Sequence, residues 1–338
     1  MERREFIGWS TALTVDAMTG GPTILLANNS INNDRKNSSE KELNPNTQWL
    51  RDAKWGLFTH YLVHMPSAPV PENMTGKQWN KKVNSFQVKQ FGDQLSLLEA
   101  PYFFITIGQG GGYFCSPNES YERLFGPSEG KLSDRDLVAE LAAELIPRGI
   151  RMCVYLTGRV HKDSETRKSW LQVITEWSKR WGKSISAWWI DGGRDLSPPV
   201  YQSYISAYKA GNADALVAFN TGPVGMNRDQ LMPATEYEDY LAGECDYFLP
   251  TCGVRVFDGK EYYLGPNISG DQLHFLNFLG QWWGTGEPRF SSELINSWTK
   301  HINDHGGTVT WDIPLSDSGI IADNYFNQVL ALSSSINK

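Results

Sequence analysis

Short apolar runs typical of β-strands alternate with helix-like segments through most of this sequence, beginning at about residue 48. A clear strand pattern is Tyr102–Ile107 (YFFITI), which ends at a cluster of glycines. A clear helix pattern has Trp170, Ile174, Trp177 and Trp181 on one face. Strands that alternate with helices predict βα units and a parallel sheet. Eight such units over about 250 residues predict an α/β fold, a single-domain (β/α)8 barrel of the TIM type.

The individual elements follow from periodicity and from turn residues. We expect strands at residues 55–61, 102–107, 151–156, 186–190, 215–220 and 307–313. We expect helices at residues 85–98, 133–145, 170–181, 200–210 and 291–303, the second of them opened by a capping box of Ser133 and Asp136. Residues 273–283 are apolar, but their periodicity fits a helix or a strand equally well. Residues 221–270 are irregular.

The N-terminal segment has a different character from the rest. Arg3-Arg4-Glu5-Phe6-Ile7 precedes a moderately apolar stretch that runs to Ala27, a pattern that resembles a twin-arginine export signal. A polar, frayed tail is the alternative, and Asp16 within the apolar stretch favours it. Residues 28–47 are rich in Asn, Ser, Lys and Glu, which is typical of a solvated linker. We therefore expect an export signal at 1–27, a linker at 28–47, the barrel at 48–338, and a periplasmic or secreted protein.

Composition excludes several classes of function. The 31 Lys and Arg against 38 Asp and Glu give a net charge of −7 without any basic run, which argues against a nucleic-acid partner or a polybasic membrane surface. No apolar run approaches the ~20 residues of a membrane span. Cysteine and histidine lack metal-ligand spacing, so we expect no metal and no cofactor. The aromatic content of 12% suits a carbohydrate partner as well as a large core, and the oligomeric state stays open.

The barrel fold itself selects candidate residues, because active sites of such barrels lie at the carboxyl ends of the strands. The polar residues that follow the expected strands are His60, Gln109 in the loop 108–113, Arg159, Asp191, Asn220 and Asp312. Asp191 is the most informative, since it follows three apolar residues and precedes two glycines. Such an Asp is suited to be a nucleophile, a general base or a metal ligand. The alternative is an Asp that closes a turn or caps the next helix.

Four motifs resemble the α-L-fucosidases of glycoside hydrolase family 29. They are residues 49–60 (WLRDAKWGLFTH), 135–138 (RDLV), 188–193 (WWIDGG) and 306–314 (GGTVTWDIP). The resemblance covers about residues 49–321 and implies a (β/α)8 glycoside hydrolase. It also implies that Asp191 is the nucleophile and that His60 contacts the sugar.

The sequence departs from that family in three places. Where the family carries a Lys-His-His-Asp-Gly-Phe segment, this chain has Gly108–Phe114 (GQGGGYF) without an imidazole, so we expect different substrate contacts. An ungapped comparison places His274 near the family's acid/base glutamate. Only about 25 residues follow the last expected strand, so we expect no counterpart of the family's C-terminal β-sandwich.

Retaining hydrolysis needs a second carboxyl group close to the nucleophile. We favour Glu244, because residues 239–244 resemble a family loop that reaches into the cleft. Glu236 is the alternative acid/base, Glu287 is a further candidate, and a solvated acidic loop is the non-catalytic alternative. We expect substrate contacts from His60, Gln109, Tyr113, Arg159, Trp189 and Trp283. Among these, the guanidinium of Arg159 would suit a sulfate or carboxylate on the sugar, and the aromatic rings would stack on sugar faces.

Three hypotheses remain at this point. The first is a retaining α-glycosidase, similar to α-L-fucosidases, that acts on a fucose-like or modified sugar of a glycan. The second is an endo-acting hydrolase of a sulfated or uronic polysaccharide. The third is a non-catalytic carbohydrate-binding relative, since fold alone does not fix function.

Overall fold

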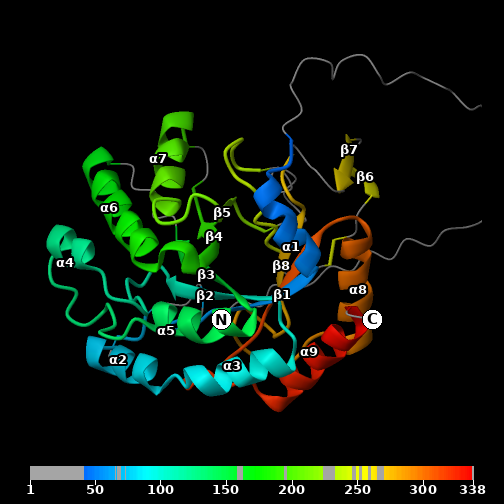
Figure 1. The fold of residues 1–338 in the computed structure, drawn as a ribbon, viewed down its shortest axis with the longest axis horizontal. Helices are drawn as coiled ribbons and strands as arrows, with labels where there is room; N and C mark the ends of the chain where they lie inside the picture. Colours follow the sequence, from blue (N-terminus) through cyan, green and yellow to red (C-terminus); the bar gives the residue numbers. More distant parts are fainter. Residues whose placement is uncertain are drawn as a thin grey trace, which may run out of the picture. The chain divides into compact units, whose positions relative to one another are not determined.

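Seven parallel strands form the central sheet of the computed structural model, in the order β5-β4-β3-β2-β1-β9-β8 (Figure 1). Their bounds are β1 Trp55–Thr59, β2 Tyr102–Gly108, β3 Arg151–Thr157, β4 Ile185–Asp191, β5 Leu216–Asn220, β8 His274–Phe278 and β9 Thr308–Asp312. The six strands expected from the sequence are confirmed, and the ambiguous segment 273–283 contains strand β8. The structure describes residues 42–64, 66, 70–72, 74–157, 163–193, 196–223, 233–245, 249–250, 253–257, 260–264 and 270–336.

The register of the sheet brings several strand ends to the same edge. Asp191 pairs with Thr157 on one side and with Asn220 on the other. Asp312 pairs with Phe58 at the end of β1, two residues before His60. Because all these strands are parallel, their carboxyl ends lie at one edge of the sheet. The polar residues that follow them are therefore neighbours in space.

An irregular segment, residues 239–245, fills the place between β5 and β8. Its backbone bonds to β8 through Cys245 N to Leu276 O (2.8 Å) and Leu276 N to Gly243 O (2.9 Å). On the other side it meets β5 through Asp239 N to Val217 O (2.9 Å). The segment thus occupies the position of an eighth strand, and the arrangement matches the predicted TIM-like barrel.

Gly243 allows this segment to approach β8. Its φ is +62°, and a Cβ atom there would lie 1.9 Å from the carbonyl oxygen of His274. We expect Gly243→Ala to lower the free energy of unfolding by about 2 kcal/mol or more. Gly149→Ala is the control, since Gly149 also has a positive φ (+79°) but open space around it, and it should cost about 1 kcal/mol. Chemical denaturation measures both; equal losses would contradict the close approach.

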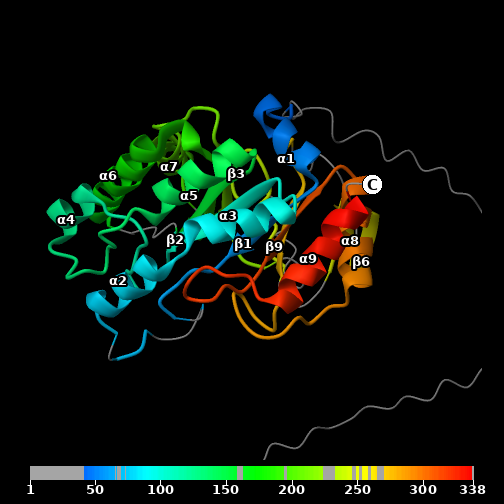
Figure 2. The same ribbon diagram turned by 60° about the horizontal axis from the view of Figure 1, so that its bottom comes forward.

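Helices surround the sheet, as Figures 1 and 2 show. The described helices are α1 Gln48–Ala53, α2 Gly76–Ser85, α3 Val88–Leu97, α4 Glu119–Phe125, α5 Leu137–Leu145, α6 Ser164–Trp181, α7 Pro198–Tyr208, α8 Ser292–Asp304 and α9 Asp323–Ile336. An antiparallel hairpin, β6 Gly253–Phe257 and β7 Lys260–Leu264, lies between residues 245 and 274 of the chain. The predicted apolar face of α6 is confirmed, because Trp170, Trp177 and Trp181 are buried.

The predicted start of α5 is wrong by one turn. Asp136, rather than Ser133, caps this helix, and its carboxylate accepts a hydrogen bond from Ala139 N (3.0 Å). The Ser133 hydroxyl accepts instead from Arg135 N (3.1 Å), which turns the chain ahead of the helix. Helices α1, α2, α4 and α9 were not predicted. In α2 only Gly76, Trp79 and Val83 are buried, too few apolar positions to give a helical pattern.

The folded unit begins upstream of Gln48. The side-chain amide of Asn44 donates to Asp239 Oδ1 (2.6 Å), and Thr47 is buried. The predicted export signal and residues 28–41 of the predicted linker lie outside the described residues.

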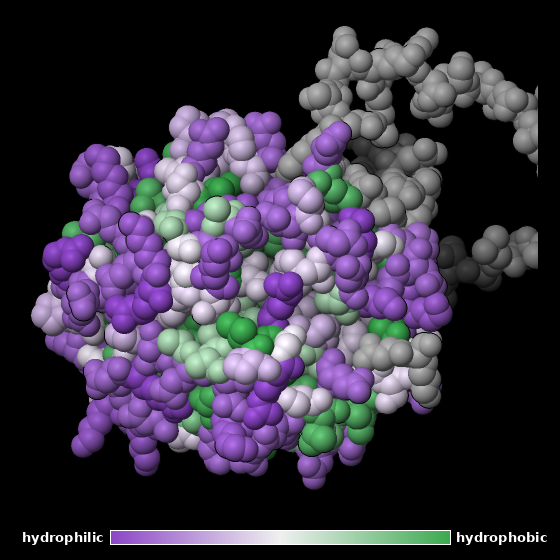
Figure 3. Space-filling model, in the orientation of Figure 1, coloured by the Kyte–Doolittle hydropathy of each residue, from purple (hydrophilic) through white to green (hydrophobic). Residues whose placement is uncertain are grey.

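Hydrophilic side chains predominate on the face drawn in Figure 3, and hydrophobic ones gather there only in small separate areas. The large hydrophobic residues that are exposed belong to different elements and include Leu97, Phe125, Leu294 and Leu330. In the part of the chain that the structure describes, no helix combines the length and the apolar character needed to span a bilayer.

Candidate active site

Asp191 is held by side chains from the strands on both sides of β4. Its Oδ2 accepts a hydrogen bond from the Tyr155 hydroxyl (2.6 Å), and its Oδ1 accepts one from the Asn220 amide (3.1 Å). Tyr155 in turn accepts from Gln109 Nε2 (2.9 Å). Burial, and then the charge of Asp191, raise the pKa of Tyr155 far above its usual value. The phenol therefore stays protonated and keeps the carboxylate oriented at neutral pH.

Glu244 lies beside Asp191. The Nδ2 atom of Asn220 donates both to Asp191 Oδ1 (3.1 Å) and to Glu244 Oε2 (2.6 Å). These two bonds limit the separation of the two carboxylate oxygens to the sum of 3.1 and 2.6 Å, that is, at most 5.7 Å. Retaining glycosidases have carboxyl groups about 5–5.5 Å apart, whereas inverting enzymes need about 6.5–9.5 Å. The upper limit of 5.7 Å for this pair of oxygens lies below the range of inverting enzymes.

Backbone pairing fixes the position of Glu244. Residue 244 forms a parallel bridge with Leu276 of β8, and its side chain is half-buried. The indole of Trp189 donates to the carbonyl of Ala242 (2.9 Å) and so ties this segment to β4. The segment that carries Glu244 is thus tied to β4 twice, through the indole of Trp189 and through the amide of Asn220.

His60 is oriented by Asp312. Asp312 Oδ1 accepts from His60 N (3.1 Å) and lies 3.0 Å from His60 Nδ1, while Asp312 Oδ2 accepts from Gly284 N (2.5 Å). Burial raises the pKa of Asp312, and the neighbouring His60 lowers it again in part. With Nδ1–H directed at this carboxylate, Nε2 is the imidazole nitrogen left for a ligand. The ring packs against Trp283 with centroids 5.3 Å apart.

A pocket of about 230 Å³, here called the aromatic pocket, opens at these strand ends. Its lining includes His60, Gln109, Tyr155, Trp189, Asp191, Glu244, Trp282 and Trp283. Tyr155 and Trp189, which both line it, stack on each other with centroids 5.2 Å apart. Flat aromatic surface beside a few fixed polar groups is the composition of a small-ligand site, and it suits a sugar ring.

A second depression of about 490 Å³, here called the glycine pocket, adjoins the first. It is lined by His64, Val70, Gln109, Gly110, Gly111, Thr157 and Asp191. Gln109 and Asp191 line both pockets. Asp191 therefore stands at a junction rather than at the closed end of one cavity.

Six of the residues singled out in the sequence line the aromatic pocket: His60, Gln109, Trp189, Asp191, Glu244 and Trp283. Tyr113 does not, because its hydroxyl donates to Met74 O (3.1 Å) and its ring packs on Trp79. The loop turns back after Gly108, which bridges Phe114, and this carries Tyr113 behind the strand. Arg159 lies outside the described residues.

The other two carboxylate candidates lie away from this pocket. Glu236 is exposed, and its carboxylate raises the pKa of the neighbouring Tyr237 through a hydrogen bond. Glu287 accepts a hydrogen bond from Asn324 of α9 (2.8 Å). The geometry therefore gives neither of them access to a substrate at Asp191.

Tyr155 and the bridging role of Asn220 were not predicted. Asn220 was found as a strand-end residue, but its contact with two carboxylates could not be inferred. For Tyr155 a signal exists in the sequence: alternate residues of a strand share a face. Cys153 and Tyr155 are both buried in the cluster inside the barrel, and Thr157 continues the same face into the glycine pocket.

His274 is a buried structural residue. Its Nδ1 donates to the carbonyl of Leu241 (3.0 Å), and its Nε2 accepts from the hydroxyl of Thr310 (2.7 Å). It therefore joins β8 to the segment 239–245 and to β9. The ungapped comparison with the fucosidase family placed His274 near the acid/base residue, but His274 does not line the aromatic pocket.

The stability of the protein should depend on pH through His274. Burial lowers the pKa of this imidazole from 6.5 to about 4. Between these values the unfolded chain binds a proton that the folded chain does not, so stability falls as pH falls. We expect His274 to make the free energy of unfolding smaller by about 2 kcal/mol at pH 4.5 than at pH 7.5. Denaturation of wild type and His274→Asn at both pH values measures this; the same pH dependence in both would contradict it.

Within the described ranges, no three His, Cys, Asp or Glu side chains are grouped so as to hold a metal ion.

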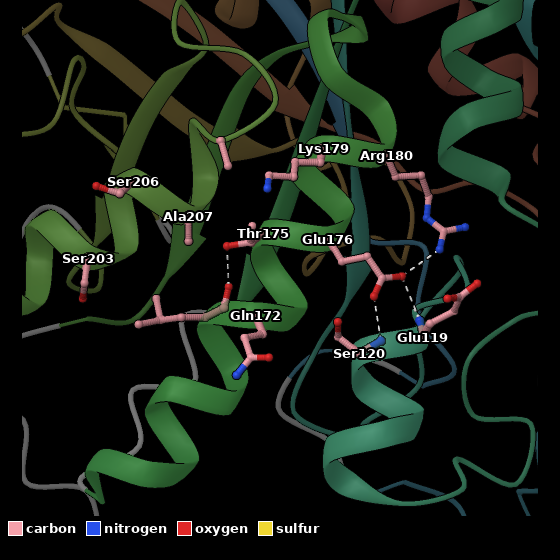
Figure 4. A pocket seen from close by; sticks show the side chains of 12 residues that line it. Glu119, Ser120, Gln172, Thr175, Glu176, Lys179, Arg180, Ser203, Ser206 and Ala207 are labelled. Carbon is pink, nitrogen blue, oxygen red and sulfur yellow. Dashed lines mark hydrogen bonds and ion pairs between the residues drawn. The ribbon is translucent and has the colours of Figure 1, made fainter.

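A larger depression of about 930 Å³ lies between α4, α6 and α7 on the outside of the barrel (Figure 4). The Glu176 carboxylate reaches from α6 to the start of α4, where it accepts from Glu119 N (2.8 Å) and Ser120 N (2.6 Å). It also pairs with Arg180 (2.7 Å). Glu176 thus links helices α6 and α4 at the edge of this depression.

The strand order and the surrounding helices define the chain as a protein with the TIM-like (β/α) barrel fold. No family model matches the sequence, and no curated protein does. Among solved structures, the chain is similar to the endo-fucoidan hydrolase P5AFcnA of glycoside hydrolase family 107, with a TM-score of 0.65 and 13% identity over 86% of this chain and 93% of that one. It is also similar to the endo-fucoidan hydrolase MfFcnA4 of the same family, with a TM-score of 0.62 and 17% identity over 86% of this chain.

A third similar structure is the family 29 α-L-fucosidase from Bacteroides thetaiotaomicron, with a TM-score of 0.62 and 14% identity over 89% of this chain and 75% of that one. The chain spans 53% of the length of MfFcnA4. At these identities the likeness establishes the fold, and the fold expected from the fucosidase-like motifs is confirmed.

Proposed function

We propose that this protein is a retaining glycoside hydrolase that cleaves fucose-like or similarly modified units of a glycan. The observation that carries the proposal is the Asn220 amide, which bonds to both Asp191 and Glu244 and keeps two of their oxygens within 5.7 Å. That spacing suits a nucleophile and an acid/base acting on the same glycosidic bond.

The reaction would proceed in two steps. Asp191 attacks the anomeric carbon while the carboxylic acid of Glu244 gives its proton to the departing glycosidic oxygen, which leaves a glycosyl ester on Asp191. Glu244, now a carboxylate, then takes a proton from water as the water oxygen attacks the same carbon and Asp191 is released. Two displacements at one carbon restore its original configuration.

The pocket chemistry supports a fucose-like sugar. The aromatic side chains that line the pocket, Trp282 and Trp283 among them, would suit the methyl group and the C–H face of a deoxy sugar. The Nε2 atom of His60 is the group that would accept a bond from a sugar hydroxyl. The similar structures named above are described as fucosidases and endo-fucoidan hydrolases, which agrees with this substrate class.

Covalent trapping tests the proposal. A 2-deoxy-2-fluoro-α-L-fucosyl fluoride should add one sugar mass to the protein, because the fluorine slows release of the ester. Peptide mapping should locate that mass on Asp191. Glu236→Gln should label like wild type, and Asp191→Asn should not label. A label on another residue, or hydrolysis of the reagent by Asp191→Asn, would contradict the assignment of the nucleophile.

Endo-acting hydrolysis of a sulfated polysaccharide is a second candidate. It is favoured by the glycine pocket, which extends the site beyond Asp191. Incubation of wild type with fucosylated, sulfated and uronic glycans, followed by mass spectrometry, separates the candidates. Released single sugars support exo-action, and released oligosaccharides support endo-action. Binding without any product supports a carbohydrate-binding protein.

Export to the periplasm or the exterior belongs to the same proposal. It is supported by Arg3-Arg4 and the apolar stretch that ends at Ala27. Replacing both arginines by lysine should retain the full-length protein in the cytoplasm; unchanged export would contradict a twin-arginine route.

A further inference from the structure

Asp191 stands where the aromatic pocket meets the glycine pocket, and Gln109 lines both. We propose that the glycine pocket binds the neighbouring sugar unit of the glycan chain through its hydroxyl groups. The site then accepts two consecutive units, one on each side of the junction at Asp191. This inference rests on the proposed function and specifies its substrate as an oligomeric glycan.

Two glycines give the glycine pocket its space. A Cβ atom on Gly111 would lie 2.7 Å from Val70 Cγ2 and 3.0 Å from His64 Cε1, so the loop is closely packed there. A Cβ atom on Gly110 would have no neighbour within 4 Å. The loop is therefore held close to the protein at residue 111 and faces open space at residue 110. Both glycines line the glycine pocket, whose volume of about 490 Å³ is large enough for a sugar ring.

The polar groups of this pocket suit hydroxyls. His64 Nδ1 and Thr157 Oγ1 are screened from solvent and have no hydrogen-bond partner among the described residues. Such atoms cost free energy until they are paired, and a sugar hydroxyl would pair with either after rotation of these short side chains. Burial lowers the pKa of His64 and so favours its neutral form.

Gln109 connects this pocket to the nucleophile. Its side chain lines both pockets, and its amide donates to the Tyr155 hydroxyl that orients Asp191. A sugar unit in the glycine pocket would contact the same loop, 108–113, that supports this chain of hydrogen bonds. Occupation of the second position is thereby linked to the geometry of the first.

The test is to fill the glycine pocket without touching the aromatic pocket. In Gly110→Phe the new ring would enter the open space. We compare kcat/KM for a fucan oligosaccharide of at least four units with kcat/KM for α-L-fucosyl fluoride, which occupies a single position. We expect the ratio of the two to fall by about tenfold or more in Gly110→Phe and by less in Gly110→Ala. Asp134→Phe adds the same ring at an exposed position outside both pockets and controls for the added surface.

The outcomes separate this inference from the proposed function. An unchanged or higher ratio in Gly110→Phe would overturn the second sugar position and leave the retaining mechanism standing. If wild type cleaves neither substrate, the hydrolase proposal fails, and calorimetry of the oligosaccharide binding to Asp191→Asn decides the inference. Weaker binding when Gly110→Phe is added would support the second position. Equal binding, or no binding in either variant, would overturn it.

Discussion

Replacing Asp191 by alanine is expected to lower kcat/KM by about 10⁴-fold or more, because the covalent route is lost with its nucleophile. The only other described carboxylate that lines the aromatic pocket is Glu244, and it is assigned to protonate the opposite side of the bond. Steady-state kinetics with an aryl α-L-fucoside would measure the loss. Thermal melting of the variant confirms that it is folded.

Azide provides a second readout for the same variant. A small anion that enters the space left by Asp191→Ala attacks from the nucleophile's face, so the expected product is a glycosyl azide of inverted configuration. Glu236→Gln is the control, because it removes an exposed carboxylate that precedes Glu244 in the same acidic stretch. This variant should keep wild-type kinetics. A loss of less than tenfold in Asp191→Ala would contradict its role.

Replacing Glu244 by alanine is expected to lower kcat/KM for a natural glycan by about 10²–10³-fold, the range of general acid catalysis. The loss should be much smaller for α-L-fucosyl fluoride, since fluoride leaves with little help from a proton. This dependence on the leaving group distinguishes an acid/base from a residue that only supports the fold. Parallel kinetics with both substrates make the measurement.

Azide should rescue Glu244→Ala with the opposite stereochemistry. The anion replaces the water of the second step, attacks the ester on Asp191, and gives a glycosyl azide of retained configuration. Glu244→Gln is the matched variant that fills the same volume without a carboxylate, and azide should rescue it less. Equal losses on the glycan and on the fluoride would contradict the assignment of Glu244.

The sequence was informative wherever a strand was apolar and ended in a polar residue. The apolar runs before His60 and Asp191 predicted strands β1 and β4, and the two polar residues marked the ends of these strands. Parallel pairing then brings such residues together without any further specification. This is why the positions of His60 and Asp191 at one edge of the sheet could be predicted from the sequence.

The segment in the position of the eighth strand could not be predicted. Side-chain carboxylates replace part of the backbone hydrogen bonding that a regular strand would make there. The Glu238 carboxylate accepts from Phe219 N (2.7 Å), and the Asp239 carboxylate accepts from Val217 N (2.9 Å). Buried carboxylates thus satisfy the backbone of β5 where a regular strand would use carbonyl groups. Burial raises the pKa of Glu238 well above its usual value. Such a segment has no alternating apolar pattern, so the sequence predicts a loop.

The positions of side chains in loops could not be predicted from the sequence either. Tyr113 follows a run of glycines, and only the fold shows that the chain turns back and buries this side chain against Trp79. Glu236 and Glu244 both belong to one acidic stretch. The pairing of residue 244 with Leu276 gives Glu244 access to the pocket, whereas Glu236 is exposed to solvent. No local property of the sequence separates the two.

The anomeric configuration of the first product tests the central claim most directly. Proton NMR during the first minutes of cleavage reads this configuration before mutarotation equilibrates it. A nucleophile at Asp191 with its acid/base Glu244 at retaining distance predicts a product with the configuration of the substrate. A product of inverted configuration would contradict the covalent mechanism and the roles of both residues.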